Sequence, residues 1–210
     1  MFPLKKVSLT AAAAALVVGL TGVAGASVQH RPASASTTPA DNLNPGPYQR
    51  ALDPLVGTWK AVKTNYILGG GTPIVSHDIT VTTHWITKTG GRFLEEQTQG
   101  TLGGNHYYRL GILGFSNIDH RYEWTTFDSV TPTAMTYRGN PVTAIPSVLS
   151  IPGEFTDPGV LGPEYLGKTI PMRTVITIGR HGHHTFDLYF TPPGQHERLV
   201  DRVVYTQKIK

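Results

Sequence analysis

The feature that most constrains this chain is an alternation of apolar and polar residues with a period of two, repeated after residue 57. In one segment, Ile79, Val81 and Trp85 alternate with polar residues, and Phe186 and Leu188 continue the pattern in a later one. Successive side chains of a β-strand point to opposite faces, so each segment indicates a strand with one core face. No window after residue 57 has the spacing of an amphipathic helix.

Nine clusters of turn-forming residues separate these segments. They are Gly69–Gly71, Gly90-Gly91, Gly103–Asn105, Asn117–His120, Thr131-Pro132, Asn140-Pro141, Asp157–Gly159, Gly179–Gly182 and Pro192–Gly194. Nine turns imply about ten strands with hairpin-length connections. Long sequential hairpins favour an up-and-down topology over a sandwich, and closure removes exposed strand edges. We therefore predict an all-β fold, an antiparallel up-and-down β-barrel of about ten strands, wide enough for a ligand cavity.

The first 26 residues have the three parts of a secretory signal. Lys5-Lys6 supply positive charge, Ala11 to Leu20 are largely apolar, and Ala24-Gly25-Ala26 form a small-residue cleavage site. The alternative, a membrane anchor, needs about 20 apolar residues, and small and polar residues interrupt this stretch. We expect residues 1–26 to be removed at this site or at Ala33-Ser34-Ala35, and the protein to be secreted or periplasmic with no membrane span afterwards.

Two further segments complete the expected domain organisation. Residues 27–47 are rich in Ala, Ser, Thr, Pro and Asn, and such a composition cannot bury enough apolar surface to become ordered. We expect a disordered linker there and a barrel domain over residues 48–210. At its start, Tyr48 to Leu55 are expected to form a short helical plug, with Leu52 and Leu55 on one face.

Composition excludes several classes of protein. The chain has no Cys, which rules out disulfides and thiolate metal sites. Its 18 basic and 14 acidic residues give a charge of +4, but removing Lys5 and Lys6 leaves 16 against 14, or +2. Because the basic residues are scattered, we expect no nucleic-acid partner. A small-molecule ligand is the expected partner, while the sequence leaves its identity and the oligomeric state open.

Several short motifs resemble a family of barrel proteins. They are Leu55-Val56-Gly57-Thr58-Trp59-Lys60, Gly91-Arg92-Phe93-Leu94-Glu95, Gly111-Ile112-Leu113-Gly114-Phe115, Trp124 with Asp128-Ser129, and Gly153-Glu154-Phe155-Thr156-Asp157-Pro158. The first resembles the G-x-W opening of calycin-type, lipocalin-like barrels. Together, over residues 52–206, they are similar to the bacterial domain-of-unknown-function family 1579. The resemblance implies a calycin-like barrel and no particular reaction.

The same resemblance implies a role for Trp59. In calycin-type barrels this Trp closes one end of the barrel beneath a basic residue of the last strand, which Arg202 or Lys208 could supply here. The opening also resembles that of nitrobindin-like haem barrels, which carry an axial His on a late strand. This chain has Ala61 and Val62 where that group has glycines, so haem is the lesser alternative and no cofactor is expected.

Charged and aromatic side chains that face inward are the candidates for a ligand site. Glu95 and Glu96 are neighbours on one strand, so only one of them faces the interior. Arginines and carboxylates of a barrel either line a polar pocket or pair structurally at the rim. The predicted ligand-binding set is Trp59, Glu95, Arg109, Trp124, Asp128, Glu154, Arg173 and Arg202.

A cluster of histidines is the strongest candidate for a metal site. His181, His183 and His184 carry imidazoles that suit zinc, copper or nickel, but a structural zinc site needs four ligands held in place. Three histidines on a hairpin tip lack that rigidity. We expect a solvated turn and no metal site.

The chain has no recognisable catalytic motif. It lacks a G-x-S-x-G elbow, an H-E-x-x-H helix and a phosphate-binding glycine loop, so catalytic residues stay unassigned. We predict a protein that is not an enzyme and that binds a small molecule inside the barrel. One alternative is an extracytoplasmic enzyme that uses an interior carboxylate and an Arg. The other is a structural or interaction module.

Overall fold

The computed structural model describes residues 41–68, 70–179 and 183–209. The expected signal segment lies outside these residues, and so do residues 27–40 of the expected linker and His181 of the histidine cluster. The last part of the expected linker is described: it includes a short 3-10 helix, η1 (Asp41–Leu43), and Asn117 Nδ2 donates hydrogen bonds to the carbonyls of Asn42 and Asn44.

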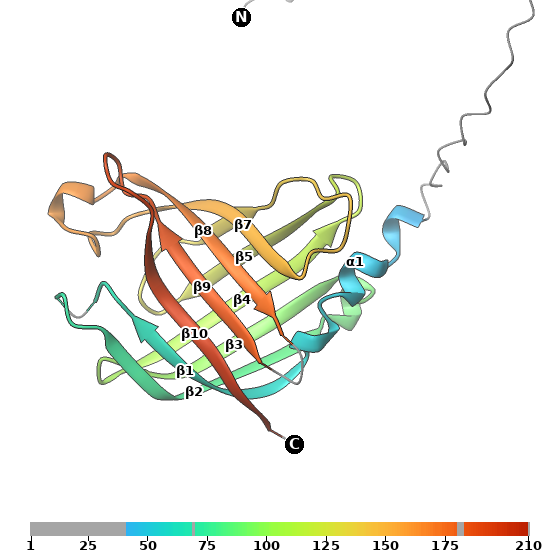
Figure 1. Cartoon of the computed structure of the whole chain (residues 1–210), viewed down its shortest axis with the longest axis horizontal. Coiled ribbons are helices and arrows are strands. Elements are labelled where there is room, and N and C mark those ends of the chain that lie inside the picture. Colours follow the sequence, from blue (N-terminus) through green and yellow to red (C-terminus); the bar gives the residue numbers. More distant parts are fainter. Residues whose placement is uncertain (1–40, 69, 180–182, 210) are drawn as a thin grey trace, which may run out of the picture. The chain divides into compact units, whose positions relative to one another are not determined.

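The described residues form ten strands in one closed antiparallel barrel (Figure 1). The strands are β1 (Gly57–Asn65), β2 (Ile74–Trp85), β3 (Phe93–Leu102), β4 (Asn105–Ser116), β5 (Arg121–Asp128), β6 (Met135–Arg138), β7 (Val148–Thr156), β8 (Thr169–Ile178), β9 (His184–Phe190) and β10 (Arg198–Ile209). Each pairs with the next along the chain, and β1 pairs with β10 to close the barrel. The up-and-down barrel predicted from the turns is confirmed.

Alternation along the strands builds the core. On β2, Ile79 and Val81 are buried, whereas Thr80 and Thr82 are only partly buried. Each strand presents one such apolar face to the interior. Because the period of a strand is two, one buried side chain fixes the direction of every neighbour on that strand until a bulge intervenes.

Three irregularities interrupt the register around β1 and β10. They fall between Lys60 and Ala61 and between Ala61 and Lys63 on β1, and between Leu199 and Asp201 on β10. A bulge inserts an extra residue and re-aims the side chains beside it. At the third of these positions both Val200 and Asp201 become buried and line the interior.

Short helices cover one end of the barrel, which we call the closed end (Figure 1). α1 (Pro47–Arg50) and η2 (Asp53–Leu55) precede β1, and η3 (Thr87–Thr89) lies in the loop between β2 and β3. A further short helix, η4 (Pro163–Tyr165), lies in the loop between β7 and β8 at the opposite end. Tyr48 stacks on Phe115 with ring centroids 4.3 Å apart, and Leu52 and Leu55 are buried. The expected helical plug is confirmed. Within the described residues, no helix is long and apolar enough to span a membrane.

Candidate binding cavity

A cavity lies at the other end of the barrel, which we call the open end. Its wall includes residues at the end of β1 and in the loops after β1, β5 and β7. The side chains leave about 60 Å³ in which the centre of a water molecule can move, room for about four water molecules. The interior is therefore not completely filled by side chains.

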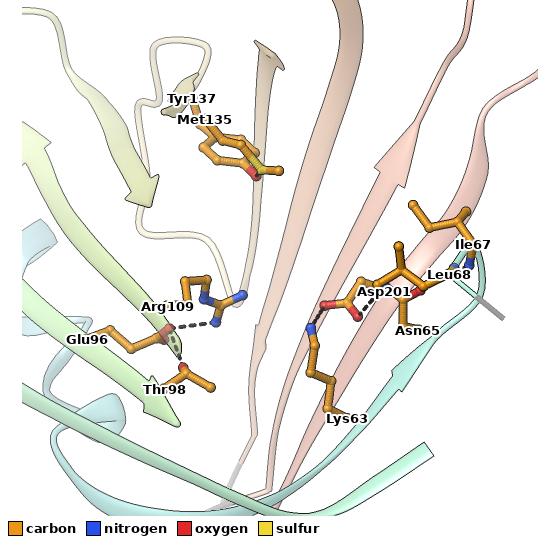
Figure 2. Close-up of polar contacts among 10 residues, drawn as sticks. All are labelled: Lys63, Asn65, Ile67, Leu68, Glu96, Thr98, Arg109, Met135, Tyr137 and Asp201. Atoms are coloured by element: carbon orange, nitrogen blue, oxygen red, sulfur yellow. Dashed lines mark hydrogen bonds and ion pairs between the residues drawn. The ribbon is translucent and has the colours of Figure 1, made fainter. Parts of the chain in front are cut away.

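One wall of the cavity carries a buried ion pair between β1 and β10. Lys63 Nζ donates to Asp201 Oδ2, and the two side chains are 3% and 7% exposed. Asn65 Nδ2 approaches Asp201 Oδ1 at 3.5 Å, and its own oxygen accepts hydrogen bonds from two backbone N–H groups of the following loop (Figure 2). Burial alone would lower the pKa of Lys63, but the adjacent Asp201 carboxylate offsets this and the pKa is raised. The ammonium therefore stays charged.

A second buried ion pair joins β3 and β4. Arg109 Nη2 donates to Glu96 Oε1 at 2.6 Å, and that carboxylate also accepts hydrogen bonds from Thr98 and Tyr205. Burial alone would lower the pKa of Arg109, and Glu96 more than offsets that effect, so the pKa is raised. Arg109 lies over the ring of Phe186 at 4.5 Å. Figure 2 shows this pair and the Lys63–Asp201 pair on separate parts of the barrel wall.

Two tyrosines complete the polar part of the cavity. Tyr107 lies beneath Lys63, whose Nζ is 4.7 Å from the ring centroid, and Tyr137 stacks on Trp124 at 5.4 Å. Burial raises the pKa of both hydroxyls. Both hydroxyls therefore stay protonated at neutral pH, and that of Tyr137 donates to Met135 Sδ at 3.6 Å.

The remaining wall is mostly apolar and faces the mouth of the cavity. It includes Ile67, Leu68, Val130, Val160, Leu188 and Phe190. Asp128, which also lines the cavity, is held by its own loop: its Oδ1 accepts hydrogen bonds from the N–H groups of Val130 and Thr131 and from the Thr131 hydroxyl. The site thus has a polar floor and an apolar mouth.

A much smaller void lies deeper, between the cavity and the closed end. Its volume is about 10 Å³, room for one water molecule at most. Trp124, Glu96 and Tyr205 line it, and Phe186 separates it from the larger cavity because it lines both. Of these two spaces in the described barrel, the larger cavity is the one with room for a ligand of several atoms.

The structure places four of the eight predicted site residues in the barrel interior. Arg109 and Asp128 line the cavity, and Trp124 lines the smaller void. Trp59 faces inward too, but at the closed end, where Lys208 Nζ lies 5.0 Å from its ring centroid. Of the two cations considered for Trp59, the structure therefore selects Lys208.

Four predicted site residues point outward and do not contribute to the cavity. Glu95 bonds to Gln97 on the outer face, and Glu154 is exposed. Arg173 forms a bidentate pair with Glu197 at 2.9 and 2.6 Å, and Arg202 pairs in the same way with Asp187 at 2.6 and 2.7 Å. In each case an adjacent buried residue, such as Leu94 beside Glu95 or Phe155 beside Glu154, occupies the inward position. The inward carboxylate of β3 is Glu96, not Glu95.

Sequence reasoning missed Lys63 and Asp201 as site residues. The inward position of Lys63 could have been predicted. Trp59, Ala61 and Lys63 are alternate residues of β1, so they face the same side of the strand. A lysine on a core face is rare unless it is paired, and that was the available signal. The inward position of Asp201 could not be predicted from alternation, because the neighbouring bulge places two consecutive residues, Val200 and Asp201, inside the barrel.

His184 corrects the expectation of a solvated histidine turn. It begins β9, is 1% exposed, and packs edge-on against Trp59 at 4.9 Å and Tyr205 at 5.8 Å. Its Nε2 donates to the Pro54 carbonyl at 3.0 Å, since a carbonyl can only accept. His184 does not line the cavity. Within the described residues, no group of three His, Asp or Glu side chains could hold a metal ion.

Comparisons with known proteins agree with this architecture without assigning a ligand. The family model described as "Protein of unknown function (DUF1579)" matches residues 44–207, which include the whole cavity wall. None of the curated proteins compared with the chain matches it.

Proposed function

Because the chain belongs to the family described as "Protein of unknown function (DUF1579)", its function has to come from the site itself, and we propose that it binds a small molecule in the open-end cavity. The observation that carries this proposal is the combination of free volume with unused hydrogen-bond donors. Arg109 Nε is buried and has no partner among the described residues. Buried polar groups are normally satisfied, so an unsatisfied one beside a void indicates water or a ligand.

The shape of the site supports binding. Ligand pockets are concave and mainly apolar, with a few convergent polar groups that fix orientation. Here the polar groups lie at the floor and the apolar side chains at the mouth. The cavity wall comes mostly from strands of a closed barrel, and rigid elements hold a binding constellation more accurately than loops do.

Native mass spectrometry of the protein purified from the cells that make it tests the proposal. Val130→Trp places a large side chain at the cavity mouth, whereas Val148→Trp makes the same change at a position that is 44% exposed. We expect a retained small molecule on the wild type and on V148W, and its loss from V130W. A wild-type protein that carries no molecule, or equal retention by both variants, would contradict the proposal.

We also propose that the protein works outside the cytoplasm. The support is the three-part segment of residues 1–26, with its charged start, apolar stretch and small-residue site. The mass of the mature protein tests this: we expect a new N-terminus after Ala26 or Ala35. An intact Met1 in the protein recovered from the cell envelope would contradict it.

A further inference from the structure

The cavity floor has more hydrogen-bond donors than the protein uses. Lys63 makes one hydrogen bond, to Asp201, although an ammonium has three N–H groups. Arg109 bonds only to Glu96, and its buried Nε has no partner among the described residues. No hydrogen bond of the Tyr107 hydroxyl is found within the described part of the chain, and its ring packs in the core beneath Lys63.

Each carboxylate of the same site already accepts hydrogen bonds from the protein. Glu96 accepts from Arg109, Thr98 and Tyr205. Asp201 accepts from Lys63 and Asn65, and one oxygen of Asp128 accepts three hydrogen bonds from its own loop. Each carboxylate thus has protein donors, whereas Lys63 and Arg109 keep N–H groups that bond to nothing among the described residues. A ligand that satisfies these donors must bring an acceptor.

The charge balance decides which kind of acceptor fits. The two cations, Lys63 and Arg109, each face a carboxylate at hydrogen-bonding distance, and Asp128 adds a third carboxylate to the interior. Among the described residues of the cavity wall no cation is left to compensate an incoming anion, and burying an uncompensated charge is costly. A cationic head would meet the N–H and O–H donors of Arg109 and Tyr107, and the one carboxylate without a cation, Asp128, is already stabilised by three hydrogen bonds from its own loop. A neutral acceptor satisfies the donors without adding charge.

We propose that the open-end cavity selects small neutral molecules that carry a carbonyl-type acceptor at one end and a short apolar body. The acceptor meets Tyr107 and Arg109, which lie two residues apart on the inward face of β4. The body extends toward Ile67, Leu68 and Val130 at the mouth. This inference rests on the proposed binding function and specifies its ligand class.

Three five-carbon probes that differ mainly in their polar group test the head-group selectivity. They are 2-pentanone, which is neutral, pentanoate, which is anionic at pH 7, and pentylamine, which is cationic at pH 7. Ligand-detected NMR titrations of the mature protein would give the three dissociation constants. We expect 2-pentanone to bind at least tenfold more tightly than either charged probe. Pentanoate or pentylamine binding as tightly as the ketone would overturn the proposal.

Tyr107→Phe removes the hydroxyl donor of Tyr107 and changes the shape of the side chain very little. It removes a hydroxyl without a protein partner and keeps the ring beneath Lys63, so the melting temperature should not fall. We expect the affinity for 2-pentanone to fall about fivefold, the size of one neutral hydrogen bond. Tyr122→Phe is the matched control, because Tyr122 bonds to the Tyr48 carbonyl at the closed end, and its affinity should equal that of the wild type.

Arg109→Lys provides a second variant that does not depend on Tyr107. It keeps a positive charge opposite Glu96 and removes the unpartnered Nε, so we again expect about fivefold weaker binding of 2-pentanone. Unchanged affinity in both Y107F and R109K would overturn the proposal. If no probe binds while native mass spectrometry finds a molecule that V130W loses, the ligand class is wrong and the proposed binding function stands. If that molecule is absent too, both fail.

Discussion

The two ends of the barrel interior are built from similar residues but differ in free volume. Each end holds a buried atom without a partner among the described residues, His184 Nδ1 at the closed end and Arg109 Nε at the open end, but the cavity lies at the open end. At the closed end, Trp59 donates to the Leu55 carbonyl at 3.0 Å, His184 donates to Pro54, and both rings pack edge-on against Tyr205. At the open end, Lys63 and Arg109 leave donors unused beside a void. Packing without free volume serves stability, whereas unused donors beside a cavity are the groups that the proposed ligand would meet.

The largest expected difference is between an ion pair inside the open end and one on the outer face, because the interior pair offsets the cost of a buried lysine. Asp201→Ala leaves Lys63 without its anion, so we expect the free energy of unfolding to fall by about 3–5 kcal/mol. Glu197→Ala removes a carboxylate from the partly exposed pair with Arg173, and we expect a loss below about 1 kcal/mol. Urea denaturation of both variants measures the difference.

A double variant separates the loss of the pair from a general failure to fold. Lys63→Met with Asp201→Leu replaces the pair by apolar side chains and should recover most of the stability lost in D201A. It should also weaken binding at the open end, because the N–H groups of Lys63 that make no hydrogen bond are lost with it. Equal losses in D201A and E197A would show that the interior pair is no different from the exterior one.

Two buried leucines, one at each end of the barrel, allow the packing of the two ends to be compared. Leu52 is 0% exposed beneath the helices of the closed end, and Leu188 is 8% exposed and lines the cavity. We expect Leu52→Ala to cost about 4–5 kcal/mol and Leu188→Ala about 3 kcal/mol, because neighbours of Leu188 already border free volume. Denaturation midpoints check this, and a larger loss in L188A would contradict the account of the cavity.

Much of the fold could be predicted from the sequence, because a period of two and turn residues act locally. The nine turns predicted the ten strands, and the apolar residues around residue 52 predicted the helical plug. The residues of the binding site were harder to predict. Glu154 and Arg173 were chosen for their chemistry, although Phe155, Met172 and Thr174 hold the inward positions beside them.

The remaining errors have a different cause. The bulge between Leu199 and Asp201 changes which residues face inward, and it arises from pairing with a distant strand. Which unpaired donors face a void also depends on packing among strands that are far apart in the sequence. Asp201 and the unused Nε of Arg109 therefore became visible only in the structure.

The smallest expected effect concerns pH at the closed end. Burial lowers the pKa of His184 below its usual value of 6.5. Below about pH 6.5 the unfolded chain binds more protons than the folded one, so the histidine lowers the free energy of unfolding as pH falls, by up to about 1.4 kcal/mol per pH unit. His184→Gln keeps a donor for Pro54 and cannot titrate. The stability difference between wild type and H184Q should shrink from pH 7.5 to 5.5, and a constant difference would contradict this.

The division between the two ends is tested most directly by backbone amide chemical shifts of the ¹⁵N-labelled mature protein during titration with 2-pentanone. We predict shifts at Lys63, Tyr107, Arg109, Val130 and Asp201, and none at Trp59, Tyr122 or His184. Shifts centred on the closed end, or no shift at any amide of the cavity wall, would contradict the assignment of the open end as the binding site.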